Sequence, residues 1–134
     1  MYRYLLEFSY FWMLVAALIG LRLGMSTLTV DREVADAVAE NSLASYHRVM
    51  QRFNWIKVIH AHTFLFAIVG ALTYFALAHV KGGGVFKDII AGGVIAASVG
   101  WTCGAGAKSR PVMGAADVVL LICLALGAYC LLGA

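Results

Sequence analysis

Charged residues, proline and pairable cysteines are all scarce in this chain. Only 13% of its 134 residues are charged, whereas 63% are hydrophobic, and there is a single proline. A water-soluble domain of this length does not need so much apolar surface, so the composition indicates an integral membrane protein. The cysteines are odd in number and lie in apolar segments, which argues against a disulfide framework. They are Cys103, Cys123 and Cys130.

The net charge is small and is not concentrated in one tract. Ten Lys and Arg residues against seven Asp and Glu residues give a formal charge of +3. Because the chain has no long basic run, the composition gives no support for nucleic-acid binding. The first apolar segment is not followed by a small-residue cleavage motif, so we expect it to be retained as a membrane helix.

Four apolar segments are long enough to cross a bilayer as helices, which takes about 20 residues. They span about 4–24, 55–80, 86–107 and 112–132. Residues 26–54 are polar, but apolar residues recur among them at helical spacing. We therefore expect a helical, amphipathic connection that lies on the surface, its second half continuing into the next segment. The sequence predicts an all-α, up-and-down four-helix bundle that forms a single membrane domain.

Glycine and alanine are concentrated in the third segment and just before it. The run Lys81-Gly82-Gly83-Gly84 predicts a short hairpin link rather than a phosphate-binding loop, because no strand precedes it. Small residues let helices approach closely in lipid, so we expect the third segment to pack at the centre of the bundle or against another subunit. The chain would then form a homo-oligomer or join a larger membrane complex. These small residues are Gly92, Gly93, Ala96, Ala97, Gly100 and Gly104.

Basic residues favour one side of the predicted bundle. The first and third connections share this side, so the positive-inside rule predicts that it faces the cytoplasm and that both termini lie outside. We interpret the chain as a multi-pass protein of the bacterial inner membrane, with membrane lipid around it. The basic residues on this side are Arg22, Arg32, Arg48, Arg52, Lys57, Lys108 and Arg110; on the other side they are Arg3, Lys81 and Lys87.

Two histidines, His60 and His62, lie within the second apolar segment. Ionisable side chains at membrane depth are costly and usually face the protein interior, where they bind something. Residues i and i+2 of a helix lie about 200° apart, so the two imidazoles face nearly opposite sides and do not chelate one ion easily. A helix with one such ring on each side is suited to hold two separate groups, or one group and one structural partner.

Polar residues of four segments fall in one layer near the basic side. Arg22 ends the first segment, His60 and His62 come early in the second, Cys103 is late in the third, and Asp117 is early in the fourth. A carboxylate can orient a histidine ring, and Arg22 can pair with a carboxylate or with the acidic groups of a bound cofactor. The alternative is that Asp117 pairs with Arg22 or Lys108 only to lower the cost of its own charge.

Imidazole is an axial ligand of haem and also binds copper or zinc. Haem needs only one histidine on a given helix face, whereas copper or zinc needs three or four converging ligands. A copper or zinc site would therefore require Cys103 and Asp117 to join one histidine. A third possibility is that both histidines only form hydrogen bonds between helices.

The second segment resembles the haem-bearing helices of the catalytic subunit of haem-copper oxidases and nitric oxide reductases. The resemblance rests on the run Lys57-Val-Ile-His60-Ala-His62-Thr-Phe-Leu-Phe, followed by Gly70 and Tyr74. The chain also looks like small four-helix, oxidase-subunit-I-like membrane proteins. In these the first helix ends in a G-x-x-x-G-like segment, as at Gly20 and Gly24 here, and the second begins with H-A-H.

The resemblance implies that His60 and His62 are axial ligands of haem b. The copper-binding histidines and the cross-linked tyrosine of the large subunit have no counterpart here, so a reductase activity is not implied. A second axial ligand would come from His47 folding back or from another subunit. We expect a haem b protein in membrane electron transfer, with quinone as a candidate partner and Arg22 as a counter-charge. The alternatives are an accessory subunit of a larger complex and a copper- or zinc-binding protein.

Overall fold

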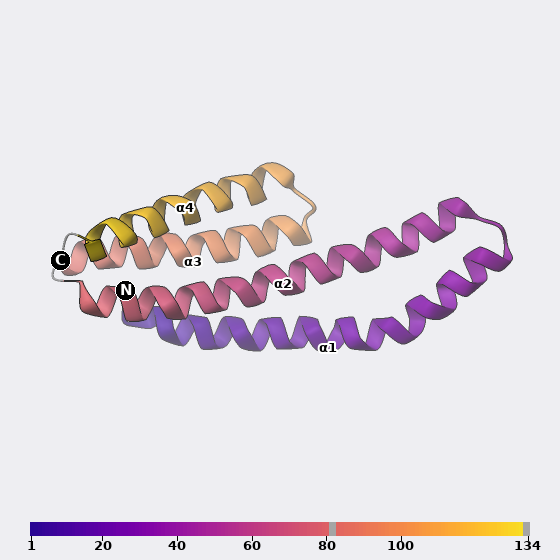
Figure 1. The fold of residues 1–134 in the computed structure, drawn as a ribbon, viewed down its shortest axis with the longest axis horizontal. Helices are drawn as coiled ribbons and strands as arrows, with labels where there is room; N and C mark the ends of the chain where they lie inside the picture. Colours follow the sequence, from indigo (N-terminus) through magenta and orange to yellow (C-terminus); the bar gives the residue numbers. More distant parts are fainter. Residues whose placement is uncertain (81–82, 133–134) are drawn as a thin grey trace.

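A computed structural model describes residues 1–80 and 83–132 and contains four α-helices and no strand within these ranges (Figure 1). The helices are α1 (Tyr4–Ala39), α2 (Leu43–His79), α3 (Gly84–Gly106) and α4 (Arg110–Leu132). Each is long and apolar enough to cross a membrane. The predicted all-α, four-helix membrane fold is confirmed. The predicted link at Lys81-Gly82-Gly83-Gly84 lies partly outside the described residues.

The polar connection between the first two membrane segments is helical, but it is not a separate helix lying across the end of the bundle. Its two halves continue α1 and α2, which run beyond the ends of α3 and α4 as a two-helix extension (Figure 1). The chain turns only at residues 40–42. Asn41 adopts a left-handed conformation with φ of 53°, and the Ser42 N–H donates to the Ala37 carbonyl at 2.9 Å, as in a Schellman C-cap. Ser42 then caps α2 by accepting from the Ser45 N–H.

The predicted turn between the last two segments has the same design. Lys108 has φ of 54°, and the Ser109 N–H donates to the Gly104 carbonyl at 2.7 Å. Pro111 follows in the first turn of α4, where its missing N–H costs no helical hydrogen bond.

The four helices form two hairpins that meet through α2 and α3. Helix α1 packs along α2 and α3 packs along α4, whereas α1 barely touches α3. Two clusters of buried side chains fill the space between the hairpins. One cluster lies near the start of α1 and the end of α2 and includes Leu5, Leu77, Ile90 and Val94. The other includes Trp12, Phe66, Trp101 and Ala116. The outer faces of α1 and α4 keep large apolar side chains exposed, as expected for surfaces that contact lipid.

The small residues of α3 are used inside the chain. A Cβ added to Gly93 would meet Sγ of Cys123, and one added to Gly104 would lie 2.9 Å from Cγ1 of Val112. Both partners belong to α4. These glycines therefore allow α3 and α4 to approach closely, in agreement with the first of the two roles predicted for the third segment.

Candidate functional site around His60 and His62

The two histidines of α2 contact different helices. His60 faces α1, where its Nδ1 lies 2.9 Å from the carbonyl oxygen of Ala16. His62 faces α3, where its ring stacks on the indole of Trp101 with centroids 4.2 Å apart and planes 6° apart. The predicted separation of the rings to opposite sides of one helix is therefore present. The pair does not form a single chelating site.

The His60 ring fills the space between α1 and α2. A carbonyl can only accept, so the Nδ1–H of His60 donates to Ala16. The ring lies directly over Gly20: a Cβ there would be 2.7 Å from Cε1 and 3.3 Å from Nε2 of His60. A flat cofactor between this ring and α1 would require the two helices to part. His60 therefore suits the structural role of the two considered for the pair.

The His62 ring is fixed by one hydrogen bond and one aromatic stacking contact. Its Nδ1 lies 2.9 Å from the carbonyl oxygen of Val58, one turn earlier in α2, and Trp101 supports one face of the ring. Phe66 contacts the Trp101 ring edge-on, with centroids 5.6 Å apart. In the neutral ring, donation from Nδ1 leaves Nε2 with the lone pair. Metal-bound histidines commonly donate their other ring nitrogen to a backbone carbonyl in this way, so the donor chemistry of His62 fits axial ligation.

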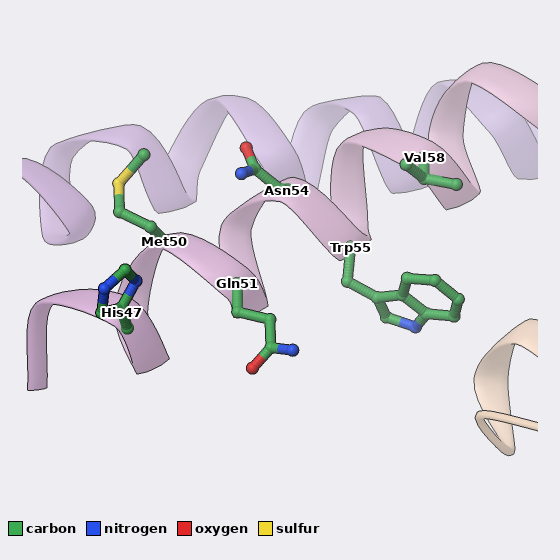
Figure 2. A pocket seen from close by; sticks show the side chains of 6 residues that line it. All are labelled: His47, Met50, Gln51, Asn54, Trp55 and Val58. Atoms are coloured by element: carbon green, nitrogen blue, oxygen red, sulfur yellow. The ribbon is translucent and has the colours of Figure 1, made fainter. Parts of the chain in front are cut away.

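A cleft of about 480 Å³ begins one turn from His62 on the same side of α2. It is lined by His47, Met50, Gln51, Asn54, Trp55 and Val58. Figure 2 shows that all six side chains come from α2, with the indole of Trp55 directed toward the end of α3. The Trp55 Nε1–H donates to the Ala105 carbonyl at 3.2 Å. The volume is within the range of small-molecule and cofactor sites, about 300–1,000 Å³.

His47 does not fold back toward the other histidines. It belongs to the same continuous helix as His62, and their separation of fifteen positions corresponds to about 22 Å along the axis. Within one chain the structure therefore does not bring His47 to the group that His62 would hold, because the connection that carries His47 is part of the continuous helix α2. His47 instead lines the far part of the cleft.

The predicted polar layer is only partly assembled. Cys103 and Asp117 are exposed, and within residues 1–80 and 83–132 no three His, Cys, Asp or Glu side chains lie close enough to hold a metal ion. The arrangement required for copper or zinc is therefore not formed by this part of the chain. Asp117 is in neither of the ion pairs found among the described residues, which are Met1 amine to Asp88 and Arg52 to Glu33.

Arg22 is also exposed, and it lies beside a different cleft from the one near His62. This second cleft, of about 290 Å³, runs between α1 and α2. Its α2 side ends at Ile56, one turn before His60. Arg22 therefore lies on the side of α2 that His60 faces, and not on the side that His62 faces.

Sequence reasoning missed the residues that fix the two rings. Gly20 was noted only as part of a G-x-x-x-G-like segment, although Ala16, Gly20 and Gly24 share a helix face by their spacing of four. The stacking of Trp101 on His62 had no signal in the sequence, because it depends on how α3 packs against α2.

Two buried polar atoms also lack a partner among the described residues: Nε1 of Trp12 and Oγ1 of Thr102.

No protein-family model matches the chain, and no curated protein or solved structure matches it.

Proposed function

We propose that the chain is a haem b protein of a respiratory membrane, such as the bacterial inner membrane, and that it carries single electrons. His62 would be the axial ligand through Nε2. The observation that carries this proposal is the state of the His62 ring, which is fixed by Val58 and Trp101 and whose Nε2 has no hydrogen-bond partner within residues 1–80 and 83–132. The H-A-H pattern and its resemblance to haem-bearing helices point to the same group.

The residues around His62 would orient the ligand and protect it from water. The Val58 carbonyl holds the proton on Nδ1, which fixes the tautomer and leaves the lone pair on Nε2 for a ligand bond. Trp101 stacks flat against the ring, and Phe66 packs edge-on against Trp101, so that two apolar rings support His62. Haem iron, when bound to such a ring, gains and loses one electron at a potential set by its axial ligand and surroundings. A second axial ligand would have to come from another copy or subunit.

The cleft beside His62 suggests a membrane quinol as the electron donor. Gln51, Asn54 and His47 can exchange hydrogen bonds with the oxygens of a quinone ring, and Met50, Trp55 and Val58 offer apolar contact. The cleft lies at the level where α3 ends, since Trp55 is bound to Ala105. This level is near the membrane surface, where a quinone headgroup can reach it.

The test is a reduced-minus-oxidised visible spectrum of the purified protein, with addition of a quinol as the reductant. We expect a low-spin haem band that is lost in His62→Ala and kept in His79→Ala. His79 is a matched control, because its Nδ1 also bonds to a carbonyl one turn earlier, that of Phe75 at 2.8 Å. His60→Ala should keep the band but lower stability. A band unaffected by His62→Ala would overturn the assignment.

A non-catalytic accessory subunit is the second candidate. It is favoured by the polar extension of α1 and α2, which runs past the ends of α3 and α4 (Figure 1) and has no obvious use in a haem carrier. Gly100 and Gly104 are less suitable as its contact surface than we expected, because both pack against α4 within the chain. This function predicts that the wild-type protein shows no cofactor absorbance.

A further inference from the structure

The cleft between α1 and α2 that contains Arg22 lies at a defined depth. Its α2 wall is Arg52, Phe53 and Ile56, and the neighbouring Trp55 is hydrogen-bonded to Ala105 near the end of α3. Helices α3 and α4 have 23 residues each, about 35 Å of helix, which is close to the thickness of the hydrocarbon core plus its boundaries. The cleft is therefore at the depth of the lipid headgroups.

The cleft is basic, although an acid also lines it. Arg22 comes from α1 and Arg52 from α2, with Glu33 as the only acidic residue among the lining side chains. Arg52 is paired with Glu33 but remains 58% exposed. Lys57 lies nearby, with its Nζ 4.2 Å from the centre of the Phe53 ring. Arg22 is in neither of the ion pairs found among the described residues.

The rest of the lining suits the parts of a lipid next to its phosphate. Val30, Phe53 and Ile56 are apolar, whereas Ser26 and Thr29 carry hydroxyls. Both hydroxyls donate to carbonyls of their own helix, at 2.8 Å and 2.9 Å, and each keeps the capacity to accept a further hydrogen bond. The arrangement combines two guanidinium groups with an apolar floor at the membrane surface.

We infer that this cleft binds the phosphodiester headgroup of an anionic phospholipid. Guanidinium groups bind phosphate oxygens in pairs of hydrogen bonds, and basic pockets between membrane helices recognise anionic headgroups. Glu33 opposes this binding, because it occupies Arg52 and adds a negative charge. The site does not involve His60 or His62, so it stands whether or not the chain binds haem.

The experiment measures phospholipid binding to the purified full chain by native mass spectrometry, with phosphatidylglycerol and phosphatidylcholine added in turn. Arg22→Gln and Arg52→Gln should each weaken phosphatidylglycerol binding by roughly fivefold, the usual contribution of one basic group near an anionic headgroup. Glu33→Gln should strengthen it by a similar factor. Arg32→Gln is the control, because Arg32 is exposed on α1 but is not among the residues that line the cleft.

Three results of this experiment would overturn the proposed lipid site. Equal losses for Arg22→Gln and Arg32→Gln, equal retention of both lipids, or weaker binding in Glu33→Gln would each overturn it. Inorganic phosphate is added as a competitor at millimolar concentration. If it displaces phosphatidylglycerol completely, the cleft is a site for free phosphate rather than for a lipid, and the assignment to lipid fails.

Discussion

Replacing Gly20 by alanine should loosen the packing of α1 against α2. The added Cβ would lie 2.7 Å from Cε1 of His60, so one of the two must move. The ring does not turn away freely, because its Nδ1 is bound to the Ala16 carbonyl at 2.9 Å. Overpacking of this kind costs about 1–3 kcal/mol, whereas replacing glycine within a helix gains up to about 1 kcal/mol. We expect a net loss of about 1–2 kcal/mol in the free energy of unfolding.

Gly24→Ala is the matched control for this prediction. It lies one turn further along the same helix face, and a Cβ there meets nothing within 4 Å. Only the helix-propensity gain applies, so stability should be unchanged or raised by up to about 1 kcal/mol. The measurement is reversible unfolding in mixed detergent micelles, followed by circular dichroism.

A double-mutant cycle shows whether the loss comes from His60. In His60→Ala the obstacle is absent, so Gly20→Ala should then be neutral or stabilising. The helix-propensity gain is the same in both backgrounds, so the coupling between the two sites should equal the overpacking cost alone, about 1–3 kcal/mol. Equal effects of Gly20→Ala and Gly24→Ala, or additive effects of Gly20→Ala and His60→Ala, would refute the close contact between His60 and Gly20.

Two further predictions concern the other helix contacts. Gly93→Ala places a methyl group against Sγ of Cys123 and should lower the free energy of unfolding by about 1–3 kcal/mol; Cys123→Ala in the same chain should restore most of it, and a loss that persists there would contradict the contact. Trp55→Phe removes the donor to the Ala105 carbonyl, 3.2 Å away, and should cost about 1 kcal/mol in the same assay. Phe53→Leu, on the α1 side of the same turn, should leave that bond in place, so an equal loss in both variants would argue against its role.

The membrane helices could be predicted because hydropathy and segment length alone identify them. The length of α1 and α2 could not be predicted in the same way, because residues 26–54 are polar and polar composition suggests a surface connection. The burial pattern of the structure shows what was missed. Side chains that face α2 recur every seven residues along α1, on through the polar part. They are Ser9, Ala16, Leu23, Val30 and Ala37.

The same repeat is present on α2, and it explains why the extension stays helical. A seven-residue spacing is typical of two helices that pack along their whole length, so the polar parts of α1 and α2 stabilise each other instead of separating at the membrane surface. Val30 and Ala37 remain only 5% and 4% exposed within this polar region. Buried or half-buried residues of α2 that recur at this spacing are Val49, Ile56, Thr63, Gly70 and Leu77, and also Phe53, His60, Ala67 and Tyr74.

Composition and hydropathy treat the two histidines alike, whereas their contacts with different helices separate them. His60 contacts α1, where its Nδ1 bonds to the Ala16 carbonyl and its ring occupies the space over Gly20. The His62 ring instead stacks on Trp101 of α3, on the side of α2 that faces away from α1. An ionisable side chain at membrane depth that hairpin packing does not require needs another reason to be there. For that reason the haem proposal rests on His62, and the stability prediction rests on His60.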